Sequence, residues 1–178
     1  MTAMEYYKRG YEFFEDGRYE EALEAFEQAQ LDGDWFFLWN GKGYAYFYLK
    51  NYEKALYCFE QAIQRDEKRV EHWRGKGNVC FYLNDYEQAL YCFEQAIQLD
   101  GKQADLWCRK GKAYGALKDY EQAIYCYDQA IQRDENFVAP WNDKGKVYFN
   151  RNDYEQALYC FEQAIQRDEK LADPWNGK

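Results

Sequence analysis

Tryptophan recurs at a fixed interval along this chain of 178 residues. Successive members of the series stand 34 residues apart, at Trp39, Trp73, Trp107, Trp141 and Trp175. A glycine, an alanine and a large aromatic residue keep the same interval: Gly43, Gly77, Gly111 and Gly145; Ala55, Ala89, Ala123 and Ala157; Phe59, Phe93, Tyr127 and Phe161. A fixed period of this length predicts a tandem array in which each unit is one small supersecondary structure.

One more unit precedes this series. It has Tyr6 in the tryptophan position and Gly10, Ala22 and Phe26 at the other repeated positions, and it is one residue shorter. Residues 86–98 and 154–166 are identical, which indicates duplication or deliberate repeat engineering. The expected units are about 3–35, 36–69, 70–103, 104–137 and 138–171, and residues 172–178 are expected to open a sixth repeat helix.

Each unit is expected to contain two α-helices. In residues 52–65 the apolar side chains recur every three or four positions, which is typical of an amphipathic helix. Residues suited to capping precede the second helices: Asn51, Asp85, Asp119 and Asp153. A glycine inside a helix costs roughly 1 kcal/mol relative to alanine. Its repetition in the first helices therefore predicts close packing there, with Gly43 facing Ala55.

The pattern W-x3-G-x2-Y…A-x3-F-x2-A at this period resembles the tetratricopeptide repeat, over residues 3–171. The resemblance implies an all-α fold, a right-handed α-solenoid of helix–turn–helix repeats. First helices would line a concave groove and second helices would form the convex back. Because one unit cannot bury its own aromatic residues, stacked neighbours are expected to share a continuous core. The last second helix is expected to keep an exposed apolar face.

Charge and hydropathy exclude several functional classes. The net charge is −9 and no basic run is present, so we expect no nucleic-acid partner. No apolar stretch approaches the ~18 residues that a membrane helix needs, and no secretory signal is visible. We expect a cytoplasmic protein that does not engage a membrane and needs no cofactor.

The cysteines and the single histidine form no recognisable catalytic or metal-binding motif. Four cysteines share one repeat position and are expected to be small buried hydrophobes, too far apart for disulfides: Cys58, Cys92, Cys126 and Cys160. No C-x2-C pair favours zinc. Cys108 is expected to face the groove as a candidate reactive thiol, and His72 is expected at the surface. We therefore expect no enzyme and no metal site.

The resemblance also assigns candidate peptide-binding residues to the first helices. They are Tyr7, Tyr11, Asn40, Tyr44, Phe47, Tyr48, Arg74, Asn78, Tyr82, Cys108, Lys112, Asn142 and Lys146. The early members are mostly aromatic and the later ones polar, with Lys112 and Lys146 aligned. This combination favours a peptide with apolar anchors and some acidic residues. Phe47 is equally compatible with simple local packing.

Family members that bind chaperone tails carry a clamp for a terminal carboxylate, which this chain matches only in part. Arg74 and Asn78 fit the clamp. Arg109 replaces an asparagine, and Ala139 and Asp143 replace two cations. Because Asp143 repels a carboxylate, we expect no chaperone-tail binding there.

Two functions are compatible with these patterns. The first is a protein–protein interaction scaffold that holds a peptide segment of a partner in the concave groove. The alternative is a self-assembling structural scaffold, natural or engineered, that forms homo-oligomers through its ends or its convex face. A recurring tyrosine on that face is either a binding stripe or one tolerated residue copied by duplication: Tyr57, Tyr91, Tyr125 and Tyr159.

Overall fold

The computed structural model describes residues 1–30 and 36–172, and these residues form ten α-helices and no strand. The helices are α1 (Ala3–Glu15), α2 (Tyr19–Gln30), α3 (Phe36–Tyr48), α4 (Tyr52–Arg65), α5 (Val70–Tyr82), α6 (Tyr86–Leu99), α7 (Ala104–Ala116), α8 (Tyr120–Arg133), α9 (Val138–Asn150) and α10 (Tyr154–Ala172). The chain divides into two units. Unit 1 (Met1–Leu99) contains α1 to α6, and unit 2 (Asp100–Lys178) contains α7 to α10.

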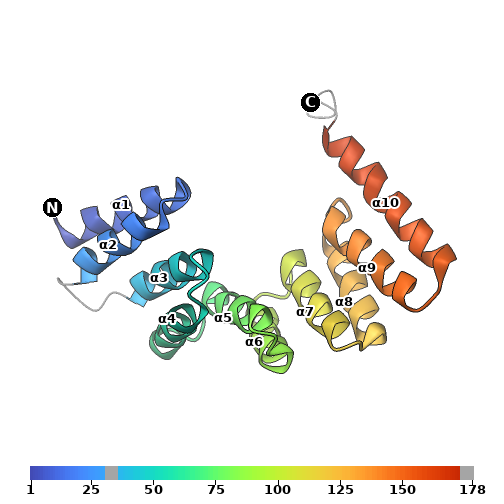
Figure 1. Ribbon diagram of the computed structural model, residues 1–178, viewed down its shortest axis with the longest axis horizontal. Coiled ribbons are helices and arrows are strands. Elements are labelled where there is room, and N and C mark those ends of the chain that lie inside the picture. The colour runs from blue at the N-terminus through green and yellow to red at the C-terminus, as the bar shows by residue number, and fades with distance from the viewer. Residues whose placement is uncertain (31–35, 173–178) are drawn as a thin grey trace. The chain divides into compact units, whose positions relative to one another are not determined.

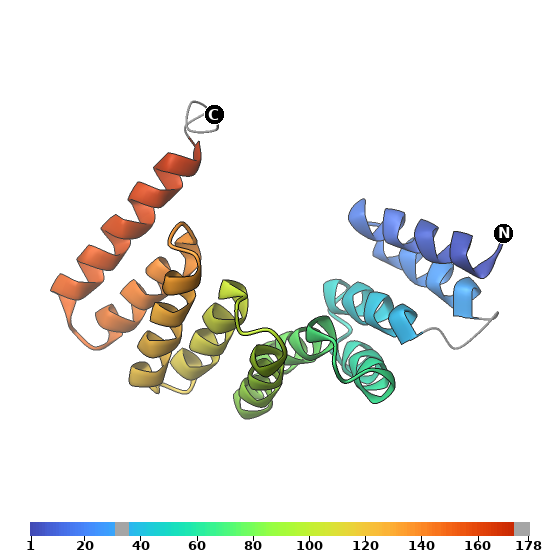
Figure 2. The ribbon, with the colours of Figure 1, turned by 180° about the vertical axis from the view of Figure 1, so that it is seen from behind.

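Consecutive helices pack as pairs. Each first helix lies beside the second helix that follows it, as α1 does with α2 and α9 with α10 (Figures 1 and 2). Within a unit, each second helix also packs against the next first helix: α2 on α3, α4 on α5, and α8 on α9. The helix–turn–helix hairpin is therefore the repeated element, and neighbouring hairpins share their apolar faces.

Side-chain caps begin the second helices as the sequence predicts. The Oδ1 atom of Asn51 accepts a hydrogen bond from the backbone nitrogen of Lys54 at 3.2 Å. Asp85, Asp119 and Asp153 each accept one from the backbone nitrogen three residues ahead, at 3.2 to 3.3 Å. Each cap satisfies an amide that the helix itself leaves without a partner.

The turn between paired helices depends on one left-handed residue. In the first such turn of the longer repeats, Lys50 has φ 58°. Its nitrogen donates to the carbonyl of Phe47, and the nitrogen of Asn51 donates to the carbonyl of Tyr46, both at 2.9 Å. These two bonds form a Schellman motif, which stops α3 and aligns the capping residue of α4. The same conformation recurs at Gly17, Asn84, Lys118 and Asn152.

The repeated glycines pack against aromatic rings of the second helices. A Cβ atom added at Gly43 would lie 2.9 Å from the nearest atoms of the Phe59 ring, closer than side chains approach. The neighbour of Gly43 is thus the Phe59 ring, and the expected Gly43–Ala55 contact is wrong. The Phe59 ring occupies the space that a side chain at position 43 would need, so only glycine fits there. Gly75, from the next repeat, meets the same ring.

The C-terminal helix differs from its counterparts. α10 has 19 residues where α4, α6 and α8 have 14, and it continues through Ala172, past the end predicted for the fifth unit. Residues 168–172 contain no glycine or proline, so nothing in their sequence breaks the helix. The rest of the predicted sixth helix, residues 173–178, lies outside the described residues.

Candidate binding site

The thirteen predicted site residues lie in both units. Nine belong to α1, α3 and α5 of unit 1, whose shared surface is called here the first-helix face. The other four, Cys108, Lys112, Asn142 and Lys146, belong to α7 and α9 of unit 2. The residues that the sequence assigns to one binding site therefore form two groups, one in each unit.

A pocket of about 400 Å³ opens on the first-helix face. Its lining residues are Met4, Tyr7, Tyr11, Asn40, Arg69, Glu71 and His72. The structure thus brings together three predicted residues, Tyr7, Tyr11 and Asn40. It adds the start of α5, which the sequence did not indicate.

Two tyrosines and an asparagine are linked inside this pocket. The rings of Tyr7 and Tyr11 meet edge to face, with centroids 4.8 Å apart. Burial, followed by the proximity of Tyr7, raises the pKa of Tyr11 above its usual value, and Tyr11 also hydrogen-bonds to the side chains of Tyr7 and Asn40. The Oδ1 atom of Asn40 is buried and has no hydrogen-bond partner in the described part of the chain. Burying an acceptor without a donor costs free energy. A ligand that donates a hydrogen bond to this atom would recover that cost.

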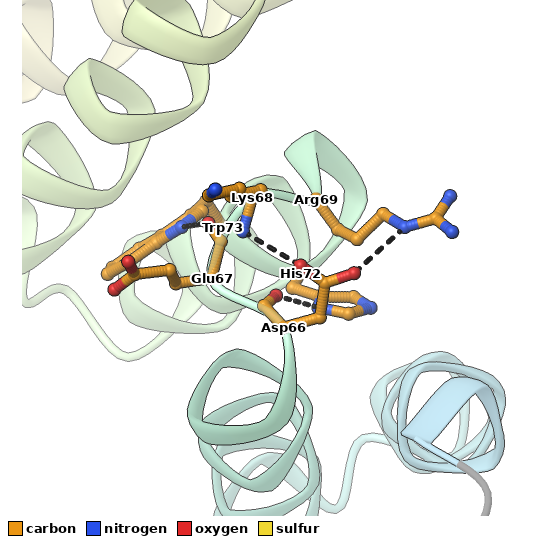
Figure 3. Close-up of polar contacts among 6 residues, drawn as sticks. All are labelled: Asp66, Glu67, Lys68, Arg69, His72 and Trp73. Atoms are coloured by element: carbon orange, nitrogen blue, oxygen red, sulfur yellow. Dashed lines mark hydrogen bonds and ion pairs between the residues drawn. The ribbon is translucent and has the colours of Figure 1, made fainter.

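The wall formed by α5 is held by the loop that precedes it (Figure 3). The carboxylate of Asp66 accepts from the backbone nitrogen of Lys68 at 3.1 Å and from Nε of Arg69 at 3.2 Å. Hydrogen bonding by the Lys68 amide, and then by Arg69, lowers the pKa of Asp66. Trp73 of α5 also holds this loop, because its Nε1 donates to the carbonyl of Glu67 at 2.7 Å.

His72 lies inside unit 1, so its expected surface position is wrong. Only 4% of its surface is exposed, and its Nδ1 donates to the carbonyl of Asp66 at 3.0 Å. Figure 3 shows the second ring nitrogen on the opposite edge of the imidazole. Burial lowers the pKa of His72, which favours the neutral ring. The equivalent residues in neighbouring repeats are the buried Leu38 and Leu106, and this spacing was the signal that could have located His72.

Tyr44, Arg74 and Asn78 are engaged within unit 1. The hydroxyl of Tyr44 donates to the carbonyl of Glu71 at 3.3 Å and accepts from Nε of Arg74 at 3.4 Å. The Tyr44 ring also packs edge-on against Phe59. Asn78 is buried. These residues connect α3 to α5 and support the pocket rather than line it.

Phe47, Tyr48 and Tyr82 belong to a seam of rings at the turn end of the helices. Tyr48 stacks on Tyr19 with centroids 4.9 Å apart, and Phe47 meets Tyr82 edge-on at 5.2 Å. Tyr82 in turn stacks on Tyr52 at 5.9 Å. Half of the surface of Tyr48 remains exposed. These three predicted residues therefore connect neighbouring repeats at a place outside the pocket.

Unit 2 is less basic on its first helices than the sequence suggests. Asp143 pairs with both aligned lysines, with Lys112 at 3.3 Å and with Lys146 at 2.8 Å. Arg109 pairs with Asp105 at 2.7 Å. The expected attraction for acidic residues is therefore reduced within the unit, although one carboxylate balances only one of the two lysines.

Cys108 and Asn142 also differ from the expected groove. Cys108 is 2% exposed, and burial raises its pKa to about 12, so the expectation of a groove-facing reactive thiol is wrong. Asn142 lines a cavity of about 710 Å³ that it shares with Phe137 and Ile165, between the start of α9 and α10. The cysteines predicted to be buried are buried, and all six are unbridged.

The convex tyrosines each pack against the tryptophan of their own repeat. Tyr57, Tyr91, Tyr125 and Tyr159 lie edge-on to Trp39, Trp73, Trp107 and Trp141, with centroid distances of 5.8 to 6.3 Å. About half of each tyrosine remains exposed. This contact accounts for the recurrence of the tyrosine through local packing. No binding role is assigned to the exposed edge of the ring.

Comparison with known families identifies the repeat. A family model described as the tetratricopeptide repeat matches residues 37–69, 104–137 and 138–171, more than half of the chain. The chain belongs to the tetratricopeptide repeat family. Two further models of tetratricopeptide repeats match residues 6–30 and 77–118. No curated protein sequence matches this chain significantly.

Several solved structures share the fold. A crystal structure of MamA has a TM-score of 0.82 at 20% identity, over 92% of this chain and 96% of its own. MamA from residue 41 to its end, from Desulfovibrio magneticus RS-1, gives 0.87 at 19% identity, over 96% and 97%. TTC0263, a thermophilic tetratricopeptide repeat protein of Thermus thermophilus, gives 0.77 at 18%, over 95% and 93%. These similarities confirm an all-α repeat solenoid.

Membership of the tetratricopeptide repeat family indicates a general class of function. Such repeats are in general non-catalytic scaffolds that bind other proteins. None of the helices in residues 1–30 and 36–172 is both long and apolar enough to cross a membrane. No three metal-ligating side chains gather anywhere in those same residues.

Proposed function

We propose that unit 1 is a peptide-binding module that holds a segment of a partner protein on its first-helix face. The pocket lined by Tyr7, Tyr11 and Asn40 carries this proposal, because it combines aromatic walls with a buried acceptor that lacks a donor among the described residues. Pockets of this size that have apolar walls and a few fixed polar groups are typical ligand sites.

The exposed seam at the other end of α3 and α5 extends the surface for the same segment. Tyr48 and Tyr82 are half exposed and are held in place by ring stacking, so contact with them orders few additional side chains. Rigid tyrosines of this kind are common anchors at interfaces. We infer that the segment enters the pocket with one side chain and covers the seam with others.

The test uses peptides selected from a displayed random library on the purified protein. Affinities of the selected peptides are then measured for the wild type and for a Tyr7→Ala, Asn40→Ala double variant. We expect about tenfold or greater weakening, since truncated anchors at interfaces commonly cost ~2 kcal/mol. Tyr57→Ala, an exposed tyrosine on the back of the same unit, is the matched control and should leave affinity unchanged.

Tyr44→Ala is unsuitable for this test because Tyr44 joins α3 to α5. Circular dichroism and thermal unfolding check that both chosen variants remain folded. Equal affinities for the wild type and the double variant would remove the pocket as the binding site.

A second function, self-association, is favoured by the surface of α10. Leu158 and Ile165 are 60% and 57% exposed, whereas their counterparts on α8, Ile124 and Ile131, are partly buried. On α8 the same face is covered by α9, which is a first helix. We infer that the complementary surface for α10 is the first helix of another repeat, supplied by a second copy of the chain.

A further inference from the structure

Three hydrogen-bond donors that line the pocket are engaged within unit 1. Nε of Arg69 donates to the carboxylate of Asp66, and Nδ1 of His72 donates to the backbone carbonyl of the same residue. The hydroxyl of Tyr11 is engaged with Tyr7 and Asn40. These three groups are therefore not available to acceptors that a ligand brings.

The acceptors of the same pocket are less fully used. Asn40 Oδ1 is buried without a partner among the described residues. The second nitrogen of His72 carries a lone pair, because the proton of the neutral ring is on Nδ1, which faces a carbonyl that can only accept. Glu71 contributes an exposed carboxylate at the rim. These three acceptors favour a ligand group that donates hydrogen bonds.

The aromatic walls favour a positively charged donor. Tyr7 and Tyr11 both line the cavity, and the face of a tyrosine ring attracts cations within about 6 Å of its centre. The charge of Arg69 is paired with Asp66, and Glu71 adds a carboxylate at the rim. The net charge of −9 adds a long-range attraction for cationic segments.

We propose that the pocket on the first-helix face selects a lysine or arginine side chain of the bound segment. This inference rests on the proposed peptide-binding function and names the chemical class of the anchor. It differs from the preference for acidic residues that Lys112 and Lys146 suggest, because those lysines belong to unit 2 and the pocket belongs to unit 1. The cation would lie against Tyr7 and Tyr11 and donate toward Asn40, with Glu71 at the rim.

The experiment starts from the peptides selected for the proposed function and changes only their charge. Each arginine is replaced by citrulline, which keeps the shape of the side chain without its charge, and each lysine by norleucine. Titration calorimetry compares each pair on the wild-type protein. We expect one position per peptide at which neutralisation weakens binding about tenfold, consistent with a desolvated cation–π contact.

A charge reversal on the protein gives an independent readout. Glu71→Lys should weaken the cationic peptide several-fold and leave its citrulline analogue almost unchanged, because only the charged anchor meets the rim charge. Glu53→Lys makes the same charge change at the start of α4, where Glu53 is also exposed. This matched control should affect both peptides equally.

The outcomes separate the two proposals. Peptides that depend on Tyr7 and Asn40 but contain no cation, or that tolerate its neutralisation, would overturn the cationic anchor and leave peptide binding intact. Equal weakening by Glu71→Lys and Glu53→Lys would also overturn it. If no selected peptide depends on the pocket residues, both proposals are wrong.

Discussion

Glycines of the first helices and aromatic rings of the second helices interlock residue by residue. A Cβ at Gly77 would lie 2.6 Å from the Phe93 ring, and one at Gly111 would lie 2.7 Å from the Tyr127 ring. These rings are almost fully buried. The usual advantage of alanine over glycine in a helix is therefore outweighed wherever a ring occupies the space of the missing methyl group.

Two glycine substitutions test this balance. Gly75→Ala should destabilise the protein by about 1–3 kcal/mol, because the new methyl group overlaps the buried Phe59 ring. Gly115→Ala should stabilise it by up to about 1 kcal/mol, since the nearest atoms would lie 3.8 Å and 3.9 Å away. Urea unfolding of both variants measures the effects. Stabilisation by Gly75→Ala would show that the ring moves aside at little cost.

His72 links the stability of the fold to pH. Its pKa is lowered by burial, while in the unfolded chain it is about 6.5. The unfolded state therefore binds more protons as the pH falls through this value, and the free energy of unfolding decreases toward acid pH. The loss ends below the lowered folded-state pKa. Above about pH 7 this residue contributes no pH dependence.

His72→Leu should remove this dependence. Leucine occupies the equivalent buried position at Leu38 and Leu106, so the site accommodates it. Between about pH 7.5 and 5.5 the wild type should lose more stability than the variant, by at most about 1.4 kcal/mol per pH unit. Urea titrations of both proteins at the two pH values provide the comparison. Parallel losses would mean that His72 charges freely within the fold.

At the scale of elements, the turns between paired helices all use one left-handed residue. Only the first repeat has glycine at this position, Gly17 with φ 75°. Lys118 adopts φ 62° in the fourth repeat, a conformation that costs a residue with a Cβ about 1–2 kcal/mol. The Schellman hydrogen bonds and the cap at Asp119 hold it there.

Exchanging the residue types at these turns should change stability in opposite directions. Lys118→Gly should raise the free energy of unfolding by about 1 kcal/mol, and Gly17→Lys should lower it by about the same amount. No atom lies within 4 Å of a Cβ placed on Gly17, so the second effect comes from backbone conformation alone. Thermal unfolding measures both. A loss of stability in Lys118→Gly would indicate that unfolded-state entropy dominates.

At the scale of the whole molecule, the proposed self-association depends on the exposed face of α10. Leu158 and Ile165 present an apolar surface to solvent beside a cavity that Ile165 helps to line. If a second copy covers this surface, the purified chain should form larger species as its concentration rises, and Leu158→Lys with Ile165→Lys should abolish them. Sedimentation velocity over a wide concentration range measures the distribution.

The control for this prediction places the same charge elsewhere. Leu83→Lys changes a leucine that is also exposed but lies in a turn of unit 1. It should leave the distribution of species unchanged. A monomeric wild-type chain at every concentration would exclude association through α10 and leave peptide binding as the proposed function.

The repeating part of this protein can be predicted from its amino-acid sequence. The period of Trp39 and its counterparts, the caps such as Asp119 and the apolar spacing of residues 52–65 are local patterns. Each repeats where the same local structure forms, so helix order and family follow without coordinates. The buried cysteines were also predictable, because they recur on the buried face of an amphipathic helix.

The site could be located only from the packing of the helices, because it is made of residues that break the period. His72 replaces a leucine in the core, Asp143 lies where it pairs with two lysines, and Asn40 joins Tyr11 from another helix. Except for the Asp143–Lys146 pair within α9, these contacts join residues from different helices or from a helix and its preceding loop. A repeat pattern reports what neighbouring units have in common, whereas the charge and hydrogen bonding of a pocket depend on where they differ.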